Sequence, residues 1–317
     1  MSTLLVCSGG GHLKQLFALA SRIGIAPEEQ VWVTFDNGLS RSILADREVV
    51  YAPFAGPRDA VNIGRIGLLA FRMLRSRHFD RAISTGSSPA VAFLPHAAAM
   101  GTRSHYIESA ARADGPSMSG RLVSRVRRIP TYTQYPAWSN DRWRYRGSIF
   151  DEYVAVEARA PRPMRRAVVS VGTQDGYRFD RLYRSLVPLL ADYDEVLWQT
   201  GSQDVSGFGI SGRSSVPHGE LKQAVAEADV VIAHSGTGAA LTALEHGKFP
   251  VLVPRLARHG EHVDDHQVQI ASELERRDLA KLRHADDLTS ADLAEAASRT
   301  TRRVTPPPFL LDEDVAA

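Results

Sequence analysis

The amino-acid sequence predicts an α/β protein with two Rossmann-like domains, each built on a parallel β-sheet covered by helices on both faces. Short runs rich in β-branched residues alternate with segments of helical periodicity, which is the pattern of parallel sheets. The chain has 317 residues, a length that suits two such domains better than a single hydrophobic core. In the first half we predict strands at residues 4–7, 31–35, 49–52, 81–85 and 104–107, and helices at 13–23 and 62–75.

The second half repeats this alternation. It predicts strands at residues 167–171, 195–199, 230–233 and 250–253, and helices at 180–190, 220–226, 239–246 and 266–274. Residues 151–166 have little apolar periodicity and are the predicted linker. We therefore expect a first domain at residues 1–155 and a second at 156–317, which ends in an extended, poorly ordered tail after residue 304. Two such domains would face each other across a cleft, with ligands beyond the carboxyl ends of the strands.

Charge and cysteine content narrow the class of protein. The formal net charge is +2, from 38 basic and 36 acidic residues, so we expect no nucleic-acid partner. Cys7 is the single cysteine, which excludes an internal disulfide and favours a reducing compartment. We find no signal-peptide pattern and no apolar run of the roughly 20 residues that a membrane span needs. The expected location is therefore the cytoplasm.

A glycine-rich turn follows the first predicted strand. Ser8, Gly9, Gly10 and Gly11 precede a predicted helix, so their amides and the helix N-terminus suit an anion such as a phosphate. The alternative is an ordinary tight strand-to-helix turn. His12 comes next, and an imidazole there suits a general base because its ordinary pKa lies near neutrality. A plain polar residue at a helix start is the alternative reading.

A second turn repeats this arrangement at the end of another predicted strand. Thr85, Gly86, Ser87 and Ser88 provide amides and hydroxyls that would enlarge the same phosphate pocket. Glu108 closes the following strand and should point toward the cleft. Its carboxylate could be a base, a group that binds hydroxyls or a helix-cap partner.

The densest motif lies in the second half, where a predicted strand runs into a small-residue loop and a helix. The amides of Ser235, Gly236, Thr237 and Gly238, which follow His234, can hold a diphosphate at the helix N-terminus. Glu245 lies about two turns further along the helix, at a distance suited to ribose hydroxyls. Gly172, Thr173 and Gln174 form another strand-end turn in the same domain.

A polar loop at residues 259–267 follows the next strand. Its amide and carboxylate groups suit the vicinal hydroxyls of a sugar. His262, Asp264 and His266 are also metal-ligand types, but the loop has no closed four-ligand pattern, so we predict no metal.

Residues 62–78 carry arginines beside large apolar residues and contain no acidic residue. This composition suits an anionic membrane surface, although a solvated helix face packed on the sheet would read the same way. A second basic cluster follows at residues 121–128. The residues predicted to meet the membrane are Leu68, Phe71, Arg72, Arg75 and Arg77.

The second half resembles family 28 glycosyltransferases through its Ser-Gly-Thr-Gly loop, Glu245 and the later Asp265-His266-Gln267. More closely, Val171-Gly172-Thr173 resembles one subunit of the dolichol-linked N-acetylglucosaminyltransferase and of bacterial capsule and exopolysaccharide glycosyltransferase pairs. The first half resembles the other subunit through residues 8–13, 106–112 and 147–150. The resemblance implies a GT-B fold and a natural fusion of two usually separate chains. The membrane helix that often begins those pairs is not evident in this sequence.

This resemblance implies an inverting transfer from a UDP-sugar to a polyprenyl-diphosphate-linked glycan at the cytoplasmic membrane face, without cofactor or metal. Glu245 would bind the ribose, Thr173 and the Ser-Gly-Thr-Gly loop the diphosphate, and Asp265, His266 and Gln267 the donor sugar. His12, or else Glu108, would be the base, and the glycine turns of the first half would hold the acceptor diphosphate. Alternatives are epimerisation of a UDP-sugar, transfer to a soluble acceptor, and a noncatalytic membrane scaffold for a partner transferase. The sequence does not decide whether the protein forms a homo-oligomer.

Overall fold

The computed structural model describes residues 1–56, 59–156, 163–172 and 176–312, which fold into two compact units. The first unit comprises Met1–Asp151 together with Pro306–Ala317, and the second comprises Glu152–Thr305. Each unit contains a parallel sheet with helices on both faces, as the sequence predicts. The division differs from the predicted one because the end of the chain belongs to the first unit.

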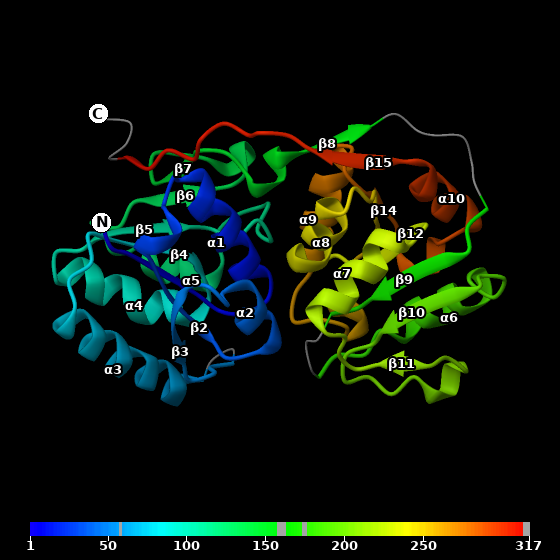
Figure 1. Ribbon diagram of the computed structural model, residues 1–317, viewed down its shortest axis with the longest axis horizontal. Helices are drawn as coiled ribbons and strands as arrows, with labels where there is room; N and C mark the ends of the chain where they lie inside the picture. Colours follow the sequence, from blue (N-terminus) through cyan, green and yellow to red (C-terminus); the bar gives the residue numbers. More distant parts are fainter. Residues whose placement is uncertain (57–58, 157–162, 173–175, 313–317) are drawn as a thin grey trace. The chain divides into compact units, whose positions relative to one another are not determined.

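The first unit is built on a seven-stranded parallel sheet with the order β3-β2-β1-β4-β5-β6-β7 (Figure 1). β1 lies at its centre and is buried at all five positions, because helices cover both faces. The strands are β1 (Thr3–Cys7), β2 (Gln30–Phe35), β3 (Glu48–Ala52), β4 (Arg81–Gly86), β5 (Arg103–Ile107), β6 (Thr131–Thr133) and β7 (Trp143–Tyr145).

Alternate residues of the central strands pack against different helices. Leu4 and Val6 contribute to a core that also contains Ile66 and Ala70 of α3. On the helix that follows β1, the Phe17 ring lies 6.0 Å from that of Trp32 in β2. The helices are α1 (Gly11–Arg22), α2 (Gly38–Ile43), α3 (Ala60–Ser76), α4 (Ser87–Ala99) and α5 (Met118–Val123).

The second unit has a six-stranded parallel sheet with the order β11-β10-β9-β12-β13-β14. Val169 and Ile232 belong to one core and Val168 and Val231 to another, so neighbouring residues of each strand face opposite layers. The strands are β9 (Arg166–Ser170), β10 (Glu195–Gln199), β11 (Gly212–Arg213), β12 (Val230–His234), β13 (Val251–Val253) and β14 (Lys281–Leu282). The helices are α6 (Asp180–Leu189), α7 (His218–Glu227), α8 (Thr237–Glu245), α9 (His266–Arg276) and α10 (Ser290–Ser298).

A separate antiparallel pair, β8 (Tyr153–Val156) and β15 (Thr300–Arg303), joins the two ends of the second unit. β8 lies inside the predicted linker, so that prediction is wrong for these four residues. Pairing with β15, which is far away in the sequence, gives this short segment its structure. The chain leaves and re-enters the first unit beside this pair, where the Val304 amide donates to the Glu152 carbonyl at 2.7 Å.

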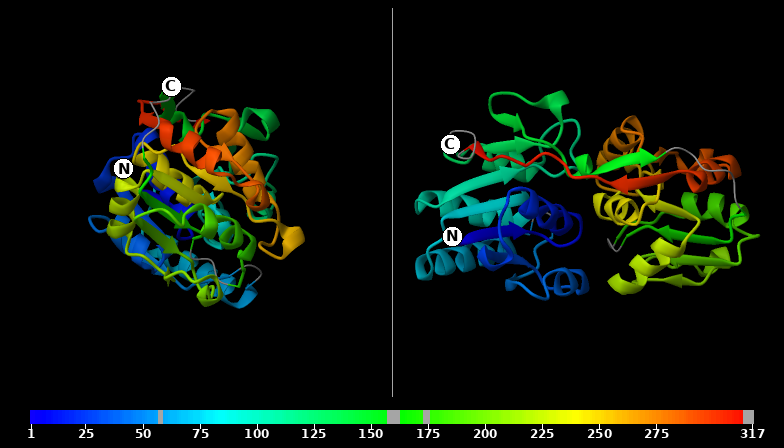
Figure 2. Two further views of the ribbon diagram at one scale, coloured as in Figure 1. Left: turned by 90° about the vertical axis from the view of Figure 1, so that its right-hand side faces the viewer. Right: turned by 45° about the horizontal axis from the view of Figure 1, so that its top comes forward.

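The prediction of a poorly ordered tail is also wrong for residues 306–312. Phe309 and Leu311 are fully buried, and the Phe309 ring meets Tyr132 of β6 edge-on, with 5.9 Å between ring centroids. The Phe309 amide donates to the carbonyl of Arg22 at 3.1 Å, and the Asp312 carboxylate pairs with Arg144. Burial of two large apolar side chains outweighs the lack of regular structure. Figure 2 shows this segment in red, running along the first unit.

Candidate functional site

The strand orders define a topological switch point in each sheet. In the second unit, β9 lies between β10 and β12, so the chain proceeds from β9 to one side and later continues on the other. In the first unit, β1 lies between β2 and β4 in the same way. Open parallel sheets bind ligands beyond the carboxyl ends of the strands at such points. The predicted glycine turns follow these four strands, β1, β4, β9 and β12.

In the second unit, the His234 ring fills the switch point between two glycines. Nδ1 of His234 lies 3.2 Å from the Ser170 carbonyl oxygen at the end of β9. A Cβ placed on Gly172 would lie 2.8 Å from Cε1 of this ring, and one on Gly236 would lie 2.3 Å from Nε2. Both contacts are closer than real Cβ atoms make, so only glycine fits at either position. The structure thus brings together Gly172, His234 and Gly236.

The same ring is electrically neutral at physiological pH. Burial, and after it the positive charge of Arg255, lower the pKa of His234 to about 3. Because the Ser170 carbonyl can only accept, Nδ1 carries the proton of the neutral ring, and Nε2 carries the lone pair. His234 therefore contributes packing and one acceptor atom to the switch point.

Helix α8 begins at this point without a side-chain cap. Gly236 occupies the N-cap position and, having no side chain, makes no side-chain cap hydrogen bond. Ser235 is fully buried, and within the described ranges its hydroxyl has no hydrogen-bond partner. Thr237 is also buried, whereas Gly238 is half-buried. A helix N-terminus of this kind presents backbone amides and a positive dipole end to an anion.

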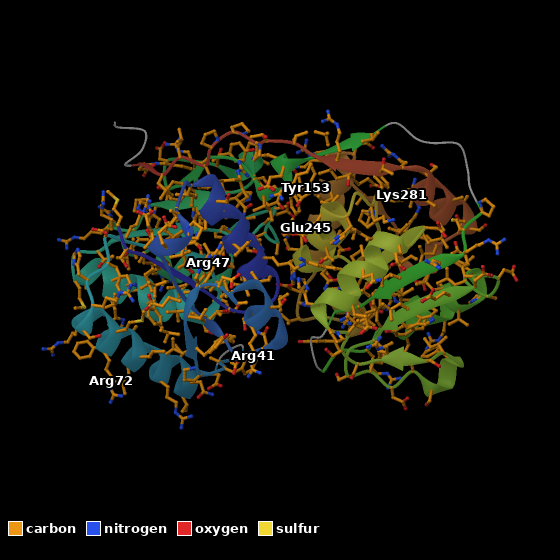
Figure 3. All side chains as sticks on the ribbon, in the orientation of Figure 1. Arg41, Arg47, Arg72, Tyr153, Glu245 and Lys281 are labelled. Carbon is orange, nitrogen blue, oxygen red and sulfur yellow. The ribbon has the colours of Figure 1, made fainter. Side chains whose placement is uncertain are left out.

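Glu245 is the last residue of α8, about 12 Å along the helix axis from Thr237 at 1.5 Å per residue. Its side chain is exposed, and Figure 3 shows it beside Tyr153 of β8. Burial raises the pKa of Tyr153, and the negative charge of Glu245 adds to this effect. Glu245 therefore lies at the opposite end of α8 from the candidate phosphate site, next to the two-stranded pair.

The three residues predicted to bind the donor sugar have partners within their own loop. Asp265 accepts a hydrogen bond from the Ala257 amide at 2.8 Å. Gln267 is buried and accepts from the Arg255 amide at 3.0 Å. His266 is hydrogen-bonded through Nδ1 to the Asp264 carboxylate. These contacts fix the shape of the loop between β13 and α9. Thr173 and Gln174, predicted to bind the donor, lie outside the described residues.

The metal-ligand types noted in the sequence also gather here. One ligand atom each from His262, Asp264 and His266 lies within 4.8 Å of the others. The His262 ring stacks on Tyr177 with 5.4 Å between centroids, and Asp264 engages His266 directly. These contacts explain why the three side chains lie close together. The absence of a metal stays a prediction.

The sequence-based prediction missed two arginines of this unit, of which Arg255 is buried and Arg181 is half-buried. Arg255 follows β13 and is 3% exposed, and Arg181 of α6 forms two hydrogen bonds, of 2.8 and 2.9 Å, with the Glu261 carboxylate. Only the position of Arg255, two residues after the end of β13, could have signalled it, because α/β proteins place ligand-binding residues beyond strand ends.

In the first unit, His12 lies against the turn that follows β4. Its Nδ1 is 2.8 Å from the Thr85 carbonyl oxygen, and the Thr85 hydroxyl donates to the His12 carbonyl at 3.0 Å. The His12 ring also lies beside Gly86. As in His234, the carbonyl partner places the proton on Nδ1 and the lone pair on Nε2. The structure therefore joins the two predicted turns of this unit, because Ser8–Gly11 precede His12 directly.

The turn after β4 is also strained. Ser87 has a φ of 69°, in the left-handed region that residues other than glycine rarely adopt. The Ser88 hydroxyl donates to the Ala55 carbonyl at 3.3 Å, which anchors the turn to the loop after β3. Strained backbone of this kind concentrates at binding sites.

Glu108 does not point into an open site, contrary to our expectation. It is fully buried, and its two oxygens accept hydrogen bonds from the Ser109 amide, from the amide and hydroxyl of Ser117, and from the Tyr106 hydroxyl. Ser117 caps α5, which folds over the end of β5 and covers the carboxylate. Burial raises the pKa of Glu108, and these hydrogen bonds oppose that effect. The cap-partner reading agrees with this geometry.

Helix α3 presents a mixed apolar and basic face to solvent. Leu68 is 49% and Phe71 43% exposed, and Arg72 and Arg75 are exposed beside them, as Figure 3 shows for Arg72. Arg77 differs, because it pairs with Glu48 of β3 and lies over the Phe79 ring. No helix in the described part of the chain is long and apolar enough to cross a membrane.

Comparison with known proteins supports this description. Residues 166–302, which span most of the second unit, match the glycosyltransferase family 28 C-terminal domain. No curated protein matches the chain.

Solved structures share the fold over nearly the whole chain. MurG of Acinetobacter baumannii is 16% identical with a TM-score of 0.60, covering 94% of each chain. The glycosyltransferase SnogD of Streptomyces nogalater is 20% identical with a TM-score of 0.58, covering 94% of this chain and 91% of its own. A UDP-GlcNAc 2-epimerase of Methanocaldococcus jannaschii, solved with UDP-GlcNAc and UDP, is 9% identical with a TM-score of 0.60, covering 99% and 97%.

These findings establish a GT-B fold with two Rossmann-like units, as the sequence predicts. The family 28 domain and the shared fold support a glycosyltransferase.

Proposed function

We propose that this protein is an inverting glycosyltransferase that moves a sugar from a UDP-sugar to a hydroxyl of a polyprenyl-diphosphate-linked glycan, in polysaccharide or glycoconjugate biosynthesis. The observation that carries the proposal is the switch point of the second unit. There, a neutral His234 ring lies between two obligatory glycines, one of which, Gly236, is the N-cap residue of α8 and provides no side-chain cap. This arrangement suits the diphosphate of a nucleotide-sugar donor.

The donor roles follow from this placement. Gly172 and residues Ser235, Gly236, Thr237 and Gly238 would hold the diphosphate, together with Thr173 and Gln174. Asp265, His266 and Gln267 would shape the sugar pocket, and Glu245 would bind the ribose. The diphosphate gains negative charge as its bond to the anomeric carbon breaks, and fixed amide dipoles would stabilise that charge without metal or cofactor.

His12 is the proposed general base. Its Nδ1–H donates to the Thr85 carbonyl, which leaves Nε2 as the atom that takes the proton of the acceptor hydroxyl. The acceptor oxygen then attacks the anomeric carbon from the side opposite the leaving UDP, so the configuration inverts. We assign Glu108 a structural role, because both of its oxygens accept hydrogen bonds from the loop that covers it.

The acceptor assignment rests on the first unit. The turns Ser8–Gly11 and Thr85–Ser88 present amides and hydroxyls at the carboxyl ends of β1 and β4, which suit the acceptor diphosphate. The exposed apolar and basic face of α3 suits an anionic bilayer, where a polyprenyl chain resides. We therefore propose peripheral attachment to the cytoplasmic face of the plasma membrane.

The test is turnover by the purified protein with a panel of UDP-sugars and a polyprenyl-diphosphate-linked saccharide in vesicles. We expect UDP release that depends on the acceptor, and a product one sugar heavier by mass spectrometry. A protein that binds no UDP-sugar in calorimetry would contradict the donor assignment. Transfer to a water-soluble saccharide alone would contradict the lipid-linked acceptor.

Epimerisation of a UDP-sugar is the second candidate, because the UDP-GlcNAc 2-epimerase shares the fold. Incubation with UDP-GlcNAc and no acceptor separates the two. An epimerase yields the epimer, whereas the proposed transferase returns the sugar unchanged.

A further inference from the structure

Arg255 is a buried arginine at the switch point of the second unit. It follows β13 and Pro254, and only 3% of its surface is exposed. Its Nη2 donates to the Val171 carbonyl at 3.1 Å, and its Nη1 lies 3.3 Å from the Tyr177 carbonyl and 3.4 Å from the Glu261 carbonyl. The guanidinium also lies 5.3 Å from the centre of the Phe179 ring. One side chain thus connects the loop after β9 to the loop after β13.

Within residues 1–56, 59–156, 163–172 and 176–312, no carboxylate pairs directly with Arg255. The negative charge of Glu261 acts on Arg255, but this carboxylate already binds Arg181 through both oxygens. The partners of the guanidinium are neutral carbonyls, and within the described ranges its Nε has no hydrogen-bond partner at all. Burial lowers the pKa of Arg255, and the charges of Tyr183 and Glu261 oppose this effect. A buried cation in this state favours an anion nearby.

The charge also acts directly on the candidate phosphate site. Arg255 is the charged group that contributes most to lowering the pKa of His234, whose ring touches Gly172 and Gly236. The carbonyl of Val171, which accepts from Arg255, belongs to the residue before Gly172. The guanidinium is therefore hydrogen-bonded to the residue that precedes Gly172, one of the glycines proposed to hold the diphosphate.

We propose that Arg255 is a positioning residue of the donor site: its guanidinium holds the carbonyl of Val171, the residue before Gly172, and supplies positive potential that favours the donor's diphosphate. This inference rests on the proposed function. In the proposed transfer, the positive charge of Arg255 would compensate negative charge on the donor's diphosphate. The His234 ring is neutral, so it adds no second positive charge to the site.

The test compares UDP with uridine, which lacks the phosphates, in calorimetry and displacement titrations. Arg255→Met should weaken UDP binding by about tenfold or more, the size of one lost charge-assisted contact, and leave uridine binding within about twofold. Arg255→Lys keeps the charge but loses the fork that reaches several carbonyls, so its UDP affinity should fall by a smaller factor. A purely structural role would weaken both ligands alike.

Arg299→Met is the matched control. The guanidinium of Arg299 also lies over a phenylalanine ring, 4.1 Å from the centre of Phe249. Phe249 precedes β13, however, whereas Arg255 follows this strand. This variant should bind UDP as the wild type does. The inference would be overturned if Arg255→Lys and folded Arg255→Met both bound UDP with unchanged affinity. Equal losses of affinity for UDP and uridine would overturn it as well. Should Arg255→Met fail to fold, Arg255→Lys decides. A wild-type protein that binds no UDP would instead contradict the proposed function.

Discussion

At the residue scale, the two histidines at the switch points share one device. In both His12 and His234, Nδ1 donates a hydrogen bond to a backbone carbonyl. This contact sets the tautomer and leaves the lone pair on Nε2. Their surroundings then separate their roles. His234 is held neutral by burial and by Arg255, which suits a packing and acceptor role. His12 is half-buried at a glycine turn, where its Nε2 can take a proton.

Replacement of His12 tests its role as base. His12→Gln should lower kcat by about 100-fold or more, the usual contribution of a general base, with little change in UDP affinity. His96→Gln is the control, because His96 makes the same Nδ1 contact with a carbonyl, that of Ala92, on α4. Steady-state kinetics and calorimetry provide the two readouts. Near-normal kcat in His12→Gln would dismiss this residue as the base.

His234 predicts how stability depends on pH. Its folded pKa of about 3 lies below the ordinary value of 6.5, so the unfolded chain binds the proton first as the pH falls. The contribution of His234 to the free energy of unfolding is thus present above pH 6.5 and lost toward pH 3. His234→Gln should make the loss of stability on acidification shallower by up to about 1.4 kcal/mol per pH unit. Urea unfolding across this range measures it, and identical slopes would show that the ring is not held neutral.

At the scale of elements, the strands and helices with strong apolar periodicity were predictable. The central strands of both sheets agree with the sequence within one or two residues, because they are buried on both sides. β14 has two residues, and β8 and β15 pair with each other across a long stretch of sequence, so no local pattern could show them. The buried tail was missed because its packing depends on Tyr132, far away in the sequence.

The candidate site was predictable only in part, for the same reason. Glycine turns at strand ends are visible in the sequence, and they lie where the strands of each switch point end. The contact of His234 with Gly172 joins two loops that only the sheet brings together. The burial of Glu108 depends on α5, and only its place shortly after a predicted strand distinguishes Arg255 from the exposed arginines around it.

Helix α3 carries the membrane prediction. Replacing both Leu68 and Phe71 by serine should reduce binding to vesicles rich in phosphatidylglycerol by about tenfold or more, because apolar burial in the interface is lost. Cosedimentation measures this, and higher salt should weaken the wild type as the arginines are screened. Val263→Ser removes a comparably exposed apolar residue from the second unit and should change nothing. Equal binding by all variants would remove α3 from the membrane surface.

The packing of the tail predicts a specific loss of stability. Phe309→Ala should lower the free energy of unfolding by about 3–5 kcal/mol, because it leaves a cavity beside Tyr132. Leu310→Ala, at the adjacent and 44% exposed position, should change it by less than about 0.5 kcal/mol. Urea denaturation of the two variants provides the comparison. Similar losses for both would contradict the burial of Phe309.

At the scale of the whole molecule, each unit has its own core and its own switch point, so a ligand of one unit need not stabilise the other. UDP at about 100 times its dissociation constant should stabilise the second unit by about 2.7 kcal/mol. Hydrogen exchange should therefore slow in β12 more than in β4. At the same UDP concentration, Glu245→Ala should show a smaller effect if Glu245 binds the ribose. Equal protection in wild type and variant would remove that assignment.

The antiparallel pair of β8 and β15 makes the second unit an insertion within the first. Both ends of the insertion meet where the Val304 amide donates to the Glu152 carbonyl, at 2.7 Å. During synthesis, the second unit can finish folding while the first still awaits Phe309 and Leu311, which are translated after it, and Phe309 packs against Tyr132. A fragment that stops at the end of β8 would leave that surface bare. Joining residue 152 to residue 304 through a short turn would instead restore a complete first unit in one continuous chain.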